Sequence, residues 1–235
     1  MIPDIEFISS LTDCMRKGNV ISDSILQRGC IHYLLALELR DLCIPLIETP
    51  SLTVNDQEIV QHYATELYNC CRETYRSAST NGWSDRKCSI ALTRYYACML
   101  LDCTYMSAIA LNRSPMAIIS TAPDLLRAYR SSSQCLKECG CEEEFTNCYM
   151  HALRVIDKIE PYLSQCENGS SFFAYKETEY DVLMEWLGVL IPSNQPDSCF
   201  TILTKIRDDC VKFLPDIKLS FVKQSYTRYP SNSLM

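Results

Sequence analysis

Apolar residues recur at spacings of three and four in about eight segments of this chain, which is the pattern of amphipathic α-helices. Prolines and glycines stand between the segments, where they end one helix and allow the next to begin. The expected helices cover residues 3–17, 22–42, 55–80, 85–111, 115–137, 142–165, 177–190 and 197–213. Short connectors predict antiparallel neighbours. We therefore expect an all-α fold, either a bundle or a short stack of helix pairs resembling TPR or α-solenoid arrays.

Several of these segments carry more specific expectations. Residues 85–111 are apolar on nearly every side, which predicts a helix at the centre of the fold. Ser114 and Pro115 predict the start of the fifth helix, and Gly140 predicts its end. We expect Pro123 to split that helix, with Thr121 capping the second piece, and Pro161 to kink the sixth.

The chain divides into one helical domain over residues 1–213 and a C-terminal tail over 214–235. Apolar types make up 47% of the 235 residues, which is enough for one sizeable core. The tail alternates apolar and polar residues over a short stretch, as an extended segment does. Its cations and aromatic rings make it a candidate surface for binding a partner, and the residues concerned are Phe221, Lys223, Tyr226, Arg228 and Tyr229.

Fifteen cysteines, an odd number at irregular spacings, predict free thiols in the cytoplasm rather than a disulfide framework. The first residues lack the charged and apolar regions of a secretion signal. The alternative is a secreted protein, because Asn112 and Asn168 both begin glycosylation sequons. We expect no membrane-spanning helix, since Arg94 and Asp102 interrupt the most apolar segment.

The densest group of metal-ligating residue types lies between residues 135 and 151. Thiolates and an imidazole at these spacings can close a tetrahedral zinc shell. The candidate ligands are Cys135, Cys139, Cys141, Cys148 and His151. The competing interpretation is ordinary core packing, because Cys135 and Cys139 also stand one helical turn apart in a chain rich in cysteine.

Motifs of catalysis are missing from the chain. The six glycines are too far apart for a dinucleotide-binding or phosphate-binding loop, and neither HExxH nor GxSxG occurs. An enzyme would have to assemble its site from distant helices, with the cysteine and histidine residues at 135–151 as the candidate. We therefore expect a protein without catalytic activity and without a cofactor, zinc excepted.

The predicted function is that of an intracellular helical adaptor or subunit of a protein complex. Fourteen tyrosines favour an interaction surface with another protein, and the net charge of −7 disfavours nucleic acid. A phosphate-binding adaptor needs arginines gathered on one inner face. Two pairs share a helix face, Arg72 with Arg76 and Arg127 with Arg130. A nucleic-acid-binding or secreted helical protein is the further alternative.

Overall fold

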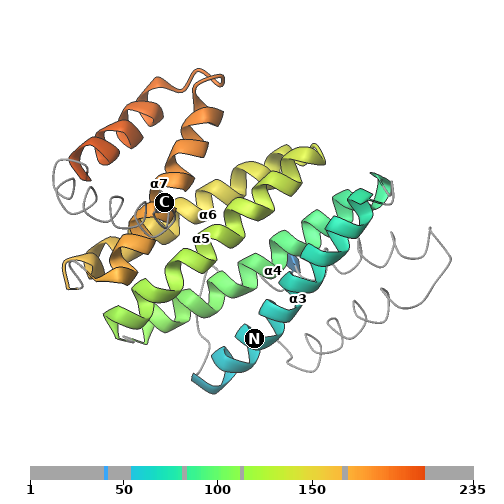
Figure 1. The fold of residues 1–235 in the computed structure, drawn as a ribbon, viewed down its shortest axis with the longest axis horizontal. Helices are drawn as coiled ribbons and strands as arrows, with labels where there is room; N and C mark the ends of the chain where they lie inside the picture. Colours follow the sequence, from blue (N-terminus) through green and yellow to red (C-terminus); the bar gives the residue numbers. More distant parts are fainter. Residues whose placement is uncertain (1–39, 42–53, 81–83, 112–113, 166–168, 210–235) are drawn as a thin grey trace, which may run out of the picture.

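The computed structural model describes residues 40–41, 54–80, 84–111, 114–165 and 169–209. These residues are helical apart from short turns, and no strand occurs among them. The helices are α3 (Val54–Thr80), α4 (Ser84–Ala110), α5 (Pro115–Glu138), α6 (Glu142–Leu163), α7 (Ser170–Leu190) and a further helix over residues 196–209 (Figure 1). The all-α prediction is confirmed. The expected helix at 3–17, nearly all of the one at 22–42 and the tail at 214–235 lie outside the described residues.

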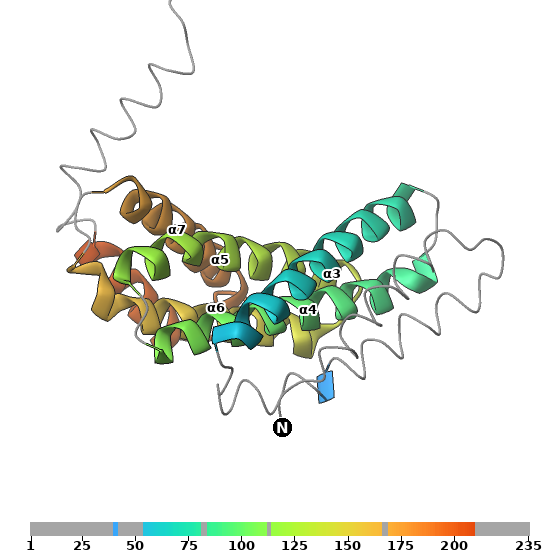
Figure 2. The same cartoon turned by 90° about the horizontal axis from the view of Figure 1, so that it is seen from below.

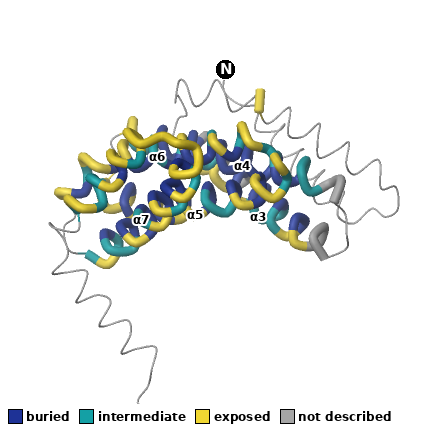
Figure 3. Tube along the Cα trace, turned by 90° about the horizontal axis from the view of Figure 1, so that it is seen from above, coloured by how far each residue is buried: buried dark blue, intermediate teal, exposed yellow. Residues whose placement is uncertain are grey.

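The described helices form a curved array of two layers. Helices α3, α5 and α7 lie on its concave side, and α4 and α6 lie on its convex side (Figures 2 and 3). The backbone of α3 lies closest to α4, and its Tyr68 and Tyr75 reach α5, whereas α5 packs on α4, α6 and α7. Helix α4 therefore forms the floor between α3 and α5, and α5 is the element that joins the two halves of the array.

The core runs along the contact between the layers. Helix α4 is buried along most of its length, as its apolar sequence predicts, and Ile90, Ala97 and Leu100 are at most 1% exposed. On the other side of α5, Tyr175 and Phe172 of α7 are equally buried. Burying one large apolar side chain stabilises a fold by roughly 1.5–3 kcal/mol. Many such side chains hold the layers together.

Helix α5 starts and ends where the sequence predicts, but it is not split at Pro123. It runs unbroken from Pro115 to Glu138, so the expected break is wrong. Ile119 and Ala122 before the proline, and Leu126 after it, are fully buried. Their burial favours one continuous helix, and it outweighs the roughly 3 kcal/mol that a proline costs inside a helix. Ser114 occupies the N-cap position without a side-chain capping bond.

The turn from α5 to α6 depends on a glycine. Gly140 has a φ of 73°, the left-handed conformation that glycine adopts without strain. This conformation lets the backbone N–H of Cys141 donate to the carbonyl of Leu136 at 3.0 Å, which closes the end of α5. Glu142, Glu143 and Glu144 then occupy the first turn of α6, where carboxylates complement the helix dipole. Helix α6 continues through Pro161 to Leu163.

Helix α7 begins seven residues before its predicted start. The predicted helix covers 177–190, whereas the observed helix begins at Ser170. Phe172 and Tyr175 are buried in this first part, so tertiary packing extends the helix toward its N-terminus. Further along, Lys176 binds Glu179 at 2.8 Å and Asp209 at 2.7 Å. This buried ion network fixes the helix over 196–209 on α7.

Candidate functional site

A groove of about 710 Å³ opens between α3 and α5, with α4 as its floor. Because α3, α5 and α7 form the concave layer, the groove lies on the concave side of the array (Figure 2). Its lining includes four arginines and one carboxylate: Arg72, Arg76, Arg94, Arg127 and Asp124. The groove is therefore electropositive in a protein whose net charge is −7.

Arg94 lies on the floor of the groove and is 3% exposed. Its Nη1 donates to the Cys135 sulfur at 3.0 Å, and its Nη2 donates to the hydroxyls of Tyr68 at 2.8 Å and Ser131 at 2.6 Å. The guanidinium carbon also lies 4.8 Å from the centroid of the Tyr68 ring. Arg94 lies on α4, and its partners lie on α3 and α5, so it connects all three helices that form the groove.

No carboxylate within the described part of the chain balances the charge of Arg94. Its hydrogen-bond partners are two hydroxyls and a thiol, and its Nε is buried without a partner there. Burial by itself lowers the pKa of Arg94, but the interactions with Tyr68 and Cys135 have the larger effect and raise the pKa overall. The guanidinium therefore stays charged. A buried charge without a counter-charge is costly in free energy. The groove therefore presents a buried cation that an anion would stabilise.

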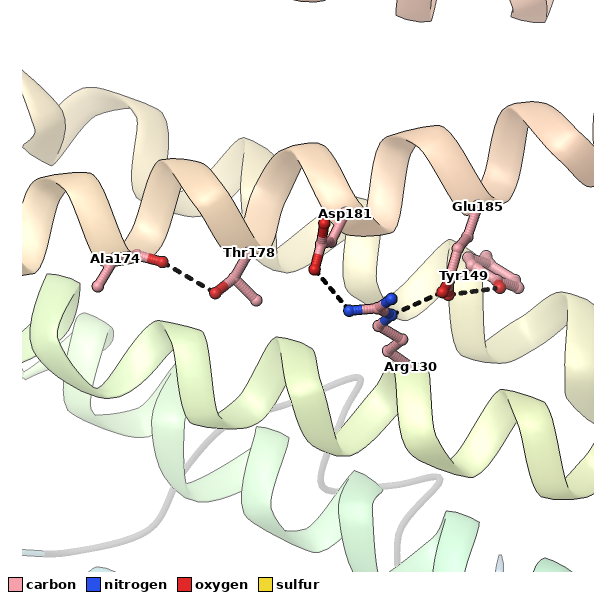
Figure 4. Close-up of polar contacts among 6 residues, drawn as sticks. All are labelled: Arg130, Tyr149, Ala174, Thr178, Asp181 and Glu185. Atoms are coloured by element: carbon pink, nitrogen blue, oxygen red, sulfur yellow. Dashed lines mark hydrogen bonds and ion pairs between the residues drawn. The ribbon is translucent and has the colours of Figure 1, made fainter. Parts of the chain in front are cut away.

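Two other arginines between helices are balanced by carboxylates. Arg130 of α5 binds Asp181 at 2.6 Å and Glu185 at 2.7 Å, both on α7, and Glu185 also accepts from the Tyr149 hydroxyl at 3.5 Å (Figure 4). Arg154 binds the buried Asp102. Arg130 therefore holds α5 on α7, and it does not line the groove although Arg127, one turn before it, does.

The remaining groove arginines differ in their surroundings. Arg72 is half-buried, and its Nε is buried without a hydrogen-bond partner among the described residues. Arg76, one turn further along α3, is exposed. Arg127 forms an exposed ion pair with Asp124 at 3.1 Å, of a kind that contributes little to stability. Arg72 and Arg94 therefore have donors that no side chain of the described part uses.

The groove has a cationic end and an uncharged end. Tyr68 donates to the carbonyl of Ala128 at 3.3 Å and contacts Arg94, which places the cationic end beside the later part of α5. Tyr105 donates to the carbonyl of Ile118 at 2.9 Å, which places the other end beside the start of α5. The lining toward that end mixes apolar and uncharged polar side chains: Gln57, Gln61, Thr65, Leu101, Thr104, Tyr105, Ala108, Ala117, Ile118, Thr121 and Leu125.

The structure does not gather the predicted zinc ligands into one shell. Cys135 accepts from Arg94, Cys139 lies 3.7 Å from the Tyr75 hydroxyl, and Cys141 lies 3.2 Å from the sulfur of Cys88. Cys148 is buried, and His151 stacks on the ring of Tyr129 with centroids 5.8 Å apart. Within the described ranges, no three histidine, cysteine, aspartate or glutamate side chains are placed to hold a metal. The predicted zinc shell is therefore not assembled.

Ten cysteines fall within the described ranges, and all of them are free thiols. Burial raises the pKa of Cys71, Cys103 and Cys148, which keeps these thiols neutral. They pack as small apolar side chains, as the cysteine content predicts. The predicted partner-binding residues of the tail, from Phe221 to Tyr229, lie outside the described residues.

Arg94, the buried arginine of the groove, is not among the predicted site residues. In the sequence it stands out only as an interruption of an apolar segment. An arginine in a helix that is apolar on nearly every side must be buried, and a buried arginine calls for an anion. An arginine within such an apolar helix is the sequence pattern that could have identified Arg94 as a candidate site residue. Its neighbours in the groove, Arg72 and Arg127, come together only through the packing of α3 and α5 on α4.

The fold and the groove define the class of protein only as an all-α protein with an arginine-lined groove. The part of the chain that the structure describes contains no helix long and apolar enough to cross a membrane. Comparison with protein-family models, with curated proteins and with solved structures finds no match to this chain.

Proposed function

We propose that this protein is a helical adaptor that binds a phosphorylated segment of a partner protein in the groove between α3 and α5. The observation that carries the proposal is Arg94, a charged side chain buried in the groove without a carboxylate among the described residues. An anion held there would supply the missing counter-charge. The proposal adds no catalytic step, because the groove arginines supply charge and hydrogen-bond donors only.

Phosphate fits these arginines better than a carboxylate does. A phosphoryl group carries a charge of roughly −1.5 to −2 near pH 7 and offers three acceptor oxygens. Arginine presents a planar fork of donors that matches this geometry. Arg72 lies in the same lining with an unused buried donor. Two such guanidinium groups suit one phosphoryl group, and they leave Arg76 and Arg127 near the rim.

A protein segment fits the groove better than a nucleic acid does. A nucleic acid carries a phosphate on every nucleotide, and the acidic body of this chain repels such a polyanion. The arginines line one part of the groove, and the remainder is mainly apolar or uncharged. This arrangement favours a segment with one phosphorylated residue and uncharged side chains to one side of it.

The test is fluorescence anisotropy with labelled peptide libraries that carry a central phosphoserine, phosphothreonine or phosphotyrosine between randomised flanks. We expect one phosphorylated library to bind and its unphosphorylated counterpart to bind at least tenfold more weakly. R94K keeps the charge but loses the planar fork, and we expect it to lower the affinity by at least tenfold. R207K is the matched control, because Arg207 is exposed and pairs with its neighbour Asp208 away from the groove.

Three results would contradict the proposal. The first is equal binding of phosphorylated and unphosphorylated peptides. The second is tighter binding of a labelled single-stranded oligonucleotide than of any peptide library, which would assign the groove to nucleic acid. The third is an R94K variant that folds normally, as judged by circular dichroism, and binds the phosphopeptides as the unaltered protein does.

A further inference from the structure

Two cysteines from different helices bring their sulfur atoms together beside the α5–α6 turn. The Sγ atoms of Cys88 and Cys141 are 3.2 Å apart, although the residues are 53 positions apart in the sequence. Cys88 lies near the start of α4, and Cys141 is the N-cap residue of α6. Both side chains are half-buried, so small reagents in solvent can reach them.

We propose that Cys88 and Cys141 are a redox modification site that forms a reversible disulfide. A disulfide requires an S–S distance of about 2.05 Å, so the two sulfurs must approach by roughly 1.2 Å. Cys141 follows Gly140 in a turn between helices, and Cys88 lies close to the N-terminal end of its helix. Both positions lie near helix ends, where small backbone shifts disturb the core least. This inference does not depend on the phosphopeptide proposal.

The neighbouring thiols have other partners. Cys135 accepts a hydrogen bond from Arg94, and Cys139 lies against the Tyr75 hydroxyl at 3.7 Å. Cys148 is 1% exposed, which removes it from reagents in solvent. Among these neighbouring thiols, Cys88 and Cys141 are the pair whose sulfur atoms lie 3.2 Å apart.

The oxidant in this proposal is a small disulfide of the glutathione type. One thiol of the pair loses its proton to solvent and attacks one sulfur of the oxidant, which forms a mixed disulfide and releases one small thiolate. The other thiol then loses its proton to solvent, attacks the protein sulfur of the mixed disulfide and releases the second small thiolate. The two released thiolates take up two protons. The sum is two protein thiols and one small disulfide giving one protein disulfide and two small thiols. Burial, followed by the hydrogen bond with Cys88, raises the pKa of Cys141 to about 12.

The experiment treats the folded, full-length protein with oxidised glutathione, blocks the remaining thiols by alkylation and digests it with trypsin without reduction. We expect peptide 88–94 to be joined to peptide 138–154, with the loss of two hydrogens, and reductant to separate them. The second peptide contains Cys139, Cys141 and Cys148, so variants assign the bond. C141S should abolish the joined pair, whereas C139S and the distant control C199S should retain it.

A thermal melt gives a second measurement on the same samples. Closing a loop between residues 88 and 141 restricts the unfolded chain, so we expect oxidation to raise the melting temperature by roughly 5 °C or more. C141S and C88S should show no such rise. The proposal is overturned if Cys88 and Cys141 leave the treatment as separate glutathione adducts or free thiols. It is equally overturned if the joined pair persists in a folded C141S variant.

Discussion

At the scale of single residues, the arginines between helices fall into two groups, those paired with carboxylates and one without a carboxylate partner among the described residues. Arg130 and Arg154 meet carboxylates and hold helices together, whereas Arg94 meets only hydroxyls and a thiol among the described residues. A buried ion pair roughly balances its own desolvation, but a buried unpaired charge destabilises the free protein. In the proposed function, a bound phosphoryl group would supply the counter-charge that Arg94 lacks among the described residues.

Replacing Arg94 with methionine should separate these two roles. We expect R94M to raise the free energy of unfolding of the unliganded protein by about 1 kcal/mol or more, because it removes an unbalanced buried charge. The same variant should lose affinity for phosphopeptides. Chemical denaturation in urea measures the first effect. A clear loss of stability in R94M would instead make Arg94 a structural residue, and R207M serves as the control for altering an exposed arginine.

The second prediction at this scale concerns pH. Burial, followed by the positive charge of Arg154, lowers the pKa of His151 from 6.5 to about 4. Between these values the unfolded chain binds a proton that the folded protein does not, so the folded state loses stability as the pH falls from about 6.5 to about 4. H151F should remove this loss and preserve the stacking on Tyr129.

Denaturation curves of the unaltered protein and of H151F, measured from pH 7.5 to 4, test this expectation. The carboxylates common to both proteins cancel in the difference between the two curves. We expect that difference to grow in favour of H151F as the pH falls through the window. A difference that stays constant with pH would show that His151 titrates alike in the folded and unfolded chains.

At the scale of elements, substitutions at two glycines show how backbone conformation affects stability. A Cβ atom added at Gly140 or at Gly188 would meet no other atom within 4 Å. Only Gly140 has a positive φ, in the turn that positions Cys141 and the start of α6, whereas Gly188 lies within α7. The two positions therefore differ in backbone conformation and not in the space available for a side chain.

We expect the same substitution to have opposite signs at these glycines. G140A should lower the free energy of unfolding by about 1–2 kcal/mol, because alanine is strained at positive φ. G188A should raise it by up to about 1 kcal/mol, because alanine favours a helix over glycine. Urea denaturation of both variants checks the signs. Two stabilising substitutions would mean that the α5–α6 turn adopts an ordinary helical φ.

At the scale of the whole molecule, the groove joins the concave sides of α3 and α5, so a ligand there should stabilise the array as a unit. A ligand at 100 times its dissociation constant stabilises the folded state by about 2.7 kcal/mol. For a protein of this size that corresponds to a rise in melting temperature of roughly 5–11 °C. Differential scanning fluorimetry with a bound phosphopeptide should show this rise. R94M should show none, and an equal rise in R94M would place the ligand elsewhere.

The helical class and most helix ends could be predicted from local patterns. Apolar spacing gave α4, and Gly140 gave the end of α5. Where the prediction was wrong, tertiary burial had overruled a local signal. Ile119, Ala122 and Leu126 carry α5 through Pro123, and Phe172 and Tyr175 extend α7 toward its N-terminus. The free energy that a proline costs inside a helix, a few kcal/mol, is smaller than the free energy gained by burying several large side chains.

Residue type and spacing within one helix are enough to show that the chain is helical, acidic and rich in thiols. Which polar groups meet depends instead on how the helices pack against one another. Among the described residues, the packing does not arrange the five predicted zinc ligands as a metal site. It places Cys141 beside Cys88, pairs Arg130 with carboxylates of α7 and leaves Arg94 without a carboxylate partner there. These outcomes depend on how α3, α5 and α7 pack against α4 and α6, and spacing along one helix carries no information about contacts between helices.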